Sequence, residues 1–296
     1  MAYGETKVYF DGSHYIAIPK KSRPSKKSVS VKSEKESKLK NEFEVAYSEV
    51  KNEKKKDKIK IITEKLKDSF ESKEKVKEFI EENMKRKTRN AIYRRMRLIR
   101  KLNLNKWNYF ITFTYDGNIL TEEEFKKKLT DCFKKLTSRK QWKYIGVWER
   151  GSSTQRLHFH GVFQIPENAM VGELVEVKDY DTRNHKMRTT LQNTYFTKRF
   201  GRNDFSIIDD YPNAMNDIAK YLIKYIEKSG EKIVSSRNVK GSFYSDIMDE
   251  DILAIMGDEE HGIKLILSDD FGCWDEGCLM GTVSPEVIDQ MRKANI

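Results

Sequence analysis

The chain has 296 residues, of which 38% are hydrophobic and 35% are charged, and its formal net charge is +11. This length suffices for one or two domains with a core, but the high charged fraction predicts that part of the chain is solvated. With three cysteines, no apolar run of membrane-spanning length and no secretory pattern at the start, disulfide-rich, membrane and exported proteins are disfavoured. We therefore expect a soluble, reduced, cytoplasmic protein without a membrane partner.

The charge is unevenly distributed along the chain. Residues 245–276 hold eleven acidic residues and one lysine, whereas residues 85–106 hold ten Lys or Arg and no Asp or Glu. A polyanion is the natural partner of the basic part. For residues 85–106 we favour phosphate contacts over a merely solvated helix face.

The N-terminal third predicts a hairpin, a linker and charged helices. Two short strands around an Asp-Gly turn predict an N-terminal β-hairpin at residues 1–19. The Lys/Ser-rich residues 20–41 predict a basic flexible linker. Residues 42–106 predict a charged helical region, because Ile59 and Ile62 begin an apolar series at helical spacing.

The pattern then becomes that of an α+β fold. Residues 107–115 alternate apolar and threonine positions and end before a Gly, as a strand does before a turn. Thr121, followed by three glutamates, predicts a capping box and a helix to about Ser138. The later predicted elements are strands at 141–149, 157–165 and 205–209 and helices at about 188–199 and 213–229. A β-α-β-β core with a later helix on the sheet is the expected architecture, with residues 166–202 as an insertion.

Two histidines on one predicted strand form the first candidate site. Successive side chains of a strand alternate faces, so His158 and His160 share one face while Leu157, Phe159 and Phe163 share the other. Two imidazoles on one face can chelate one metal ion through nitrogen. Alone, the pair also fits a structural pair or a solvated strand edge.

The preceding strand offers a carboxylate to this pair. If Arg150 pairs with Leu157 in the hairpin, Glu149 lies opposite His158. Two imidazoles and one carboxylate leave positions open for phosphate and water, as a catalytic metal site requires. A register slip of one residue would instead make Glu149 an ordinary exposed acid.

The last predicted helix carries two tyrosines one turn apart. Tyr221 and Tyr225 share a face with Lys224 and Lys228, so each phenol is followed three residues later by a lysine. Nearby ammonium charge favours the nucleophilic phenolate and holds a phosphate. A solvated amphipathic helix with half-buried tyrosines would show the same pattern.

Three segments in fixed order resemble motifs of the HUH endonuclease superfamily, specifically the rolling-circle replication initiator (Rep) proteins of small phages, plasmids and single-stranded DNA viruses. FITFTY (110–115) resembles motif I, LHFHGVF (157–163) resembles motif II, and YLIKYIEKSG (221–230) resembles motif III. The resemblance spans roughly residues 107–240. It predicts an HUH endonuclease domain at 107–240 and leaves residues 241–296 as an acidic C-terminal extension.

This resemblance implies a central, five-stranded antiparallel sheet of RRM-like layout. It also implies a Mg²⁺ or Mn²⁺ ion held by His158, His160 and Glu149. Attack by Tyr221 or Tyr225 would leave a 5′-phosphotyrosine link and a free 3′-hydroxyl. The double YxxKYxxK pattern is similar to the two-tyrosine A proteins of microviruses, whereas YIEKSG alone is similar to a single-tyrosine motif that selects Tyr225.

We therefore expect an enzyme that nicks and rejoins single-stranded DNA at a replication origin. The chain lacks a GxxxxGK[ST] motif and thus the appended helicase domain, which favours a phage or plasmid in a bacterial host cell whose helicase and polymerase act as partners. The residues expected to contact DNA are Arg94, Arg95, Arg97, Arg100, Thr112 and Thr114. A relaxase, a single-strand transposase, or a non-catalytic origin- or RNA-binding protein are the alternatives.

Overall fold

A computed structural model shows that the chain has an α+β fold, as the sequence predicts. It describes residues 2–20, 34–50, 53–151, 155–181, 185–208, 214–229, 233–258 and 262–294. The chain divides into two compact units, residues 21–95 and residues 1–20 together with 96–296. Among the helices described, none is long and apolar enough to span a membrane.

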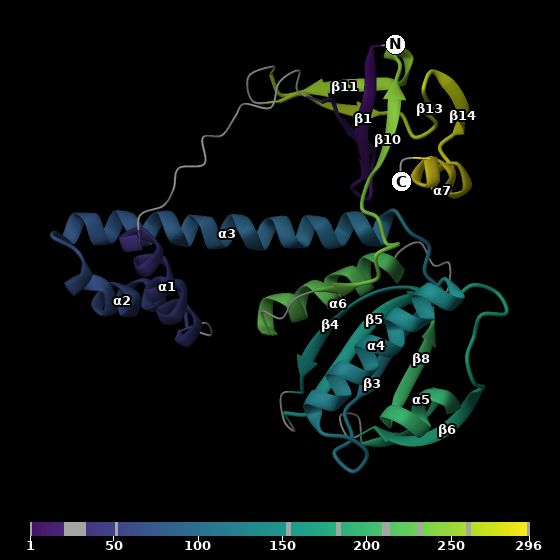
Figure 1. The fold of residues 1–296 in the computed structure, drawn as a ribbon, viewed down its shortest axis with the longest axis horizontal. Coiled ribbons are helices and arrows are strands. Elements are labelled where there is room, and N and C mark those ends of the chain that lie inside the picture. Colours follow the sequence, from purple (N-terminus) through teal and green to yellow (C-terminus); the bar gives the residue numbers. More distant parts are fainter. Residues whose placement is uncertain are drawn as a thin grey trace. The chain divides into compact units, whose positions relative to one another are not determined.

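Helices make up the unit of residues 21–95 (Figure 1). They are α1 (Glu34–Glu49), α2 (Lys55–Leu66), the short η1 (Lys67–Ser69) and the first part of α3 (Lys73–Asn103). Helix α1 begins inside the predicted linker at 20–41, so that boundary is wrong for residues 34–41, and residues 21–33 lie outside the described part. The helix forms because Phe43, Ala46 and Val50 recur on one face and are buried in the core of this unit.

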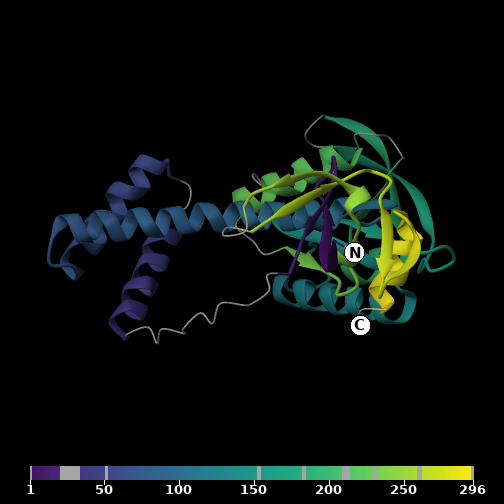
Figure 2. The same ribbon diagram turned by 90° about the horizontal axis from the view of Figure 1, so that it is seen from above.

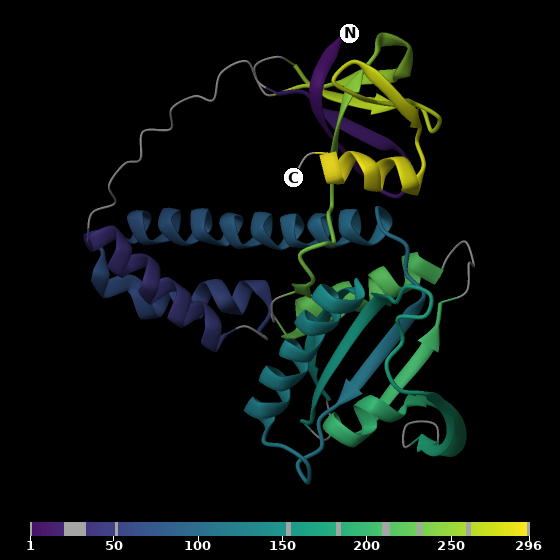
Figure 3. The same ribbon diagram turned by 45° about the vertical axis from the view of Figure 1, so that its right-hand side comes forward.

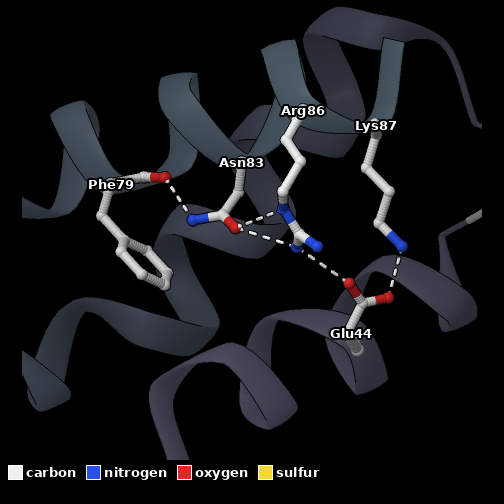
Figure 4. Close-up of polar contacts among 5 residues, drawn as sticks. All are labelled: Glu44, Phe79, Asn83, Arg86 and Lys87. Atoms are coloured by element: carbon white, nitrogen blue, oxygen red, sulfur yellow. Dashed lines mark hydrogen bonds and ion pairs between the residues drawn. The ribbon is translucent and has the colours of Figure 1, made fainter. Parts of the chain in front are cut away.

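A polar network ties α1 to α3 in the same unit (Figure 4). The Glu44 carboxylate accepts hydrogen bonds from Lys87 and, at 2.9 Å, from Arg86. Arg86 also donates to Asn83 Oδ1, and the Asn83 amide donates to the Phe79 carbonyl oxygen at 2.8 Å. Two cations of the basic stretch at 85–106 thus already have carboxylate partners within the protein.

A five-stranded sheet forms the centre of the predicted endonuclease domain. Its strands are β3 (Tyr109–Thr114), β4 (Lys143–Arg150), β5 (Leu157–Gln164), β8 (Asn203–Ile207) and β9 (Val234–Ser235). Their order is β8-β3-β5-β4-β9, and every neighbouring pair is antiparallel. The five-stranded antiparallel sheet expected from the sequence is therefore present.

Helices cover both faces of this sheet (Figure 3). Helix α4 (Glu122–Lys140) begins at the predicted capping box of Thr121 and packs Phe125 and Phe133 against the face that holds Phe159. Helix α6 (Ala214–Ser229) packs Leu222 against the opposite face, in one cluster with Val162. The histidine face is thus covered at its Val162 end by apolar side chains.

A glycine pair lets β4 and β5 approach closely beside the histidines. A Cβ on Gly146 would lie 2.4 Å from the His160 carbonyl oxygen and 2.5 Å from the Phe159 ring. We expect Gly146→Ala to lower the free energy of unfolding by about 1–3 kcal/mol, measured by urea denaturation, because the strands must separate. Gly4→Ala is the control, since its nearest neighbour lies 3.6 Å away, and should change it by at most about 0.5 kcal/mol. Equal stability of the two variants would contradict this packing.

Residues 166–202 differ from their prediction. The expected helix from Arg188 to Arg199 is replaced by strand β7 (Lys186–Asn193), which pairs with β6 (Leu174–Asp181), and by the short helix α5 (Thr194–Phe200). The helix begins at Asn193, whose side chain accepts hydrogen bonds from the backbone N–H groups of Tyr195 and Phe196. An Asn N-cap is the signal that divides strand from helix here.

The two ends of the chain form a second, seven-stranded sheet. Its strands are β1 (Tyr3–Phe10), β2 (Tyr15–Ile18), β10 (Phe243–Ile247), β11 (Ile252–Met256), β12 (Lys264–Leu267), β13 (Gly272–Asp275) and β14 (Cys278–Thr282). The order is β11-β12-β2-β1-β10-β13-β14, and η2 (Asp249–Asp251) lies between β10 and β11. Helix α7 (Pro285–Ala294) packs Ile288 and Met291 against Val8 of β1 (Figure 2). The predicted hairpin at 1–19 and the acidic extension at 241–296 therefore belong to one folded part.

Candidate active site

The histidine pair lies on β5, where the alternation predicted from the sequence holds. Leu157, Phe159 and Phe163 are buried in the core beneath α4. His158 and His160 lie on the opposite face, and their ring centroids are 5.8 Å apart. This strand forms because its apolar side chains alternate with the imidazoles, so burial of one face presents both imidazoles on the other.

Glu149 is held against this pair by the predicted register. Arg150 pairs with Leu157, and Glu149 pairs with His158. The Glu149 carboxylate contacts His160, with 3.1 Å between Oε2 and Nε2, and both side chains are only 9% exposed. One carboxylate and one imidazole are thus brought together in a largely dry environment, where their interaction is stronger than in water.

Two threonines of β3 orient the imidazoles. Thr112 pairs with His160 and Thr114 with His158, and the threonine hydroxyls lie 3.0 and 3.1 Å from the two Nδ1 atoms. The sequence analysis assigned both threonines to DNA contacts, and the structure gives their hydroxyls this other partner. Because Thr112 and Thr114 are spaced as the histidines are, alternation on the neighbouring strand is the signal that could have found this role.

The histidines are in an environment that disfavours their protonation. Burial lowers the pKa of His158 to about 4. Positive charge at His160, Arg156 and Arg202 acts in the same direction. The Glu149 carboxylate opposes these effects. His158 is therefore neutral at pH 7, the form in which an imidazole nitrogen can bind a metal.

The three predicted metal ligands are neighbours but do not yet surround one point. Among the residues described, no group of three or more His, Cys, Asp or Glu side chains has an arrangement that could hold a metal ion. Glu149 and His160 are in contact, and His158 lies beside them with its Nδ1 at Thr114. The donor types nevertheless fit a divalent cation, because imidazole nitrogen and carboxylate oxygen are its usual protein ligands.

Helix α6 brings a tyrosine to the histidines. The Tyr221 ring centroid lies 5.7 Å from that of His160 and 5.5 Å from that of Phe110. Its side chain remains 37% exposed, and Lys224, three residues later, is exposed. The backbone of Tyr225 and Lys228 belongs to α6, but their side chains lie outside the described part. Of the two candidate nucleophiles, Tyr221 is thus the one whose ring is placed beside the imidazoles.

Comparison with known families gives these segments a common context. Residues 108–230 match a family model of replication-associated proteins of the ORF2 type. The match contains the histidine strand, Glu149 and both tyrosines, and it supports a replication initiator role with origin DNA as the partner. No curated protein and no solved structure matches the chain.

The arginines predicted to contact DNA lie outside the matched residues, on α3. Arg94, Arg95 and Arg97 are exposed, as are most of their neighbours on this part of the helix. Arg100 is half-buried, and its guanidinium lies 3.5 Å from the centroid of the Tyr9 ring. A stacked Arg100 stabilises the fold by a cation–π contact, so the exposed arginines are the better placed for phosphate contacts, which stay a prediction.

Proposed function

We propose that this chain is an endonuclease and strand transferase that initiates replication by nicking single-stranded origin DNA and later rejoins it. The observation that carries the proposal is the contact of Tyr221 with His160, which in turn bonds Glu149. A phenol beside an imidazole and a carboxylate is an arrangement suited to attack on a phosphodiester. The match to a replication-associated family supports the same reaction class.

The ligands of a Mg²⁺ or Mn²⁺ ion in this proposal are His158, His160 and Glu149. When bound, a divalent ion supplies positive charge that polarises the scissile phosphate. Thr112 and Thr114 hold the two Nδ1 atoms, so each imidazole turns Nε2 toward the open side of the site. The contact between His160 Nε2 and Glu149 supports this assignment, because two of the donor atoms already converge.

The covalent step conserves one phosphodiester bond. The phenolate oxygen of Tyr221 or Tyr225 attacks the scissile phosphorus, and the bond from phosphorus to the 3′-oxygen breaks. The protein then carries a 5′-phosphotyrosine, and the departing 3′-oxygen takes up the proton that the phenol lost. Lys224 and Lys228, each three residues after a tyrosine, offset the negative charge that develops on phosphate. Attack by a 3′-hydroxyl on the phosphotyrosine reverses the step and rejoins the strand.

Such a nick provides a 3′-hydroxyl primer for rolling-circle synthesis. A host helicase and polymerase are the partners that this role requires, because the sequence contains no Walker-type nucleotide-binding motif. The energy of the broken phosphodiester bond is kept in the tyrosine ester, so rejoining needs no nucleotide cofactor.

Adduct formation tests the proposal. The full chain, mixed with single-stranded oligonucleotides of random sequence and Mn²⁺, should yield a protein–DNA adduct that survives boiling in detergent and runs as a retarded band on a denaturing gel. Chelation by EDTA before mixing should reduce the adduct by about 100-fold or more. Binding of the oligonucleotides without any adduct would contradict nicking and favour a non-catalytic DNA-binding role.

A further inference from the structure

The histidine face of the sheet carries an arginine beyond the predicted site. Thr112 pairs with Asp204 of β8, and the Thr114 amide donates to the Arg202 carbonyl oxygen at 2.9 Å. Because directly paired residues share a face, Arg202 lies in one row with Thr114 and His158, while Asp204 lies in the row of His160. Two strand spacings, about 10 Å, separate the backbone at Arg202 from that at His158.

The turn before β8 fixes Arg202 in this position. Gly201 ends α5 with a φ of +86°, a backbone conformation that favours glycine. Asn203 is buried, accepts a hydrogen bond from the Asn193 amide at 2.7 Å and donates to the Gly201 carbonyl oxygen at 3.2 Å. Since Asn203 points toward α5, its neighbour Arg202 points to the opposite face.

Arg202 belongs to a set of four charges on β6, β7 and β8. It pairs with Asp179 at 2.7 Å, and Arg188 pairs with Asp204. Asp179 and Arg188 are themselves opposite each other in the register of β6 and β7. The two carboxylates are 25% and 20% exposed, whereas both arginines are 47% exposed. The carboxylates therefore lie beneath, and the guanidinium groups reach solvent.

We propose that Arg202 binds the DNA phosphate next to the scissile one, with Asp179 holding its guanidinium ready. The proposal rests on the proposed function, because it requires a DNA strand to cross the histidine face. A guanidinium has five N–H donors, and a single carboxylate contact leaves others for a phosphate. A half-exposed, pre-ordered arginine also loses less side-chain entropy on binding than a free one.

The opposed charges of Arg202 and Asp179 allow a sharp test. Affinity for a labelled oligothymidine is measured by fluorescence anisotropy with EDTA present, so that binding is read without cleavage. Arg202→Ala should weaken binding by about 5- to 10-fold and lower the slope of log affinity against log salt by about one. Asp179→Asn should leave affinity unchanged or raise it, since it removes a negative charge and spares the guanidinium.

Arg199→Ala controls for net charge, because Arg199 lies on α5 with its guanidinium 3.8 Å from the centroid of the Tyr195 ring. Two outcomes overturn the proposal. One is an equal effect of Arg202→Ala and Arg199→Ala. The other is a loss of affinity in Asp179→Asn that matches Arg202→Ala, which would assign the pair a purely structural role. Failure of the proposed function is distinguishable, since the wild-type protein would then bind oligothymidine but form no tyrosine adduct with Mn²⁺.

Discussion

Replacing Tyr221 and Tyr225 together with phenylalanine should abolish the covalent protein–DNA adduct, with a loss of about 10³-fold or more in its rate of formation. The double variant keeps both rings and removes only the two hydroxyl oxygens, so the packing of Tyr221 against Phe110 and His160 is retained. The adduct is measured on denaturing gels with Mn²⁺ and random-sequence single-stranded DNA. Oligothymidine affinity should stay within about 3-fold of the wild type, because the phosphate contacts lie elsewhere.

The single variants separate the two phenols. Tyr221→Phe and Tyr225→Phe differ in position by one helical turn and are matched in chemistry. Loss of the adduct in one single variant identifies the nucleophile, whereas retention in both means that either phenol can attack. Tyr195→Phe is the control for loss of a hydroxyl, because Tyr195 lies on α5 and packs against the core on the α4 side. An adduct that persists in the double variant would contradict a nucleophile on α6.

The second large effect is expected for His160→Ala. This substitution should lower adduct formation by about 10³-fold and weaken Mn²⁺ binding, measured by calorimetry, by about 10- to 100-fold or more. It also removes a partner of the buried Glu149 carboxylate and of the Thr112 hydroxyl. We therefore expect a loss of about 1–3 kcal/mol in the free energy of unfolding.

His185→Ala is the matched control for His160→Ala, since His185 is exposed on the turn before β7. It should leave adduct formation, Mn²⁺ affinity and stability unchanged. The stability loss in His160→Ala does not explain a loss of activity if the variant still binds oligothymidine with the affinity of the wild type. A His160→Ala protein that forms the adduct at the wild-type rate would remove His160 from the site.

The local part of the site could be predicted from the sequence because alternation and hairpin closure are local. A short polar loop between two strands fixes the register, and Glu149 therefore pairs with His158 as predicted. The same alternation places Phe159 in the core and His160 on the other face. The role of Thr112 was missed because β3 and β5 are far apart in the sequence, and their register is not fixed by a tight turn.

The second sheet could not be predicted, because its central pairing is between distant residues. Lys7 of β1 pairs with Tyr244 of β10, and no local pattern indicates which strands will meet over such a separation. The acidic residues at 245–276 were interpreted as an extension on charge alone. In the structure, Asp246 accepts hydrogen bonds from the backbone amides of Glu5 and Gly277, so at least one of these acids holds the sheet together.

Arg202 escaped the sequence analysis for a different reason. It follows residues whose strand β7 was predicted as helix, so its place beside Thr114 could not be inferred. Once β7 and β8 are known, the alternation of Arg202 and Asn203 is enough to assign their faces. An error in one secondary-structure element thus hid a charged residue of the candidate DNA-binding face.

Peptide mapping of the covalent adduct tests the central claim most directly. After adduct formation with Mn²⁺, nuclease digestion and proteolysis, mass spectrometry should find a nucleotide joined through its 5′-phosphate to a peptide of α6, at Tyr221 or Tyr225. The mass increment and its position would establish the chemistry and the nucleophile together. A nucleotide on a residue outside α6, or no modified peptide in a sample that contains the retarded band, would contradict the account.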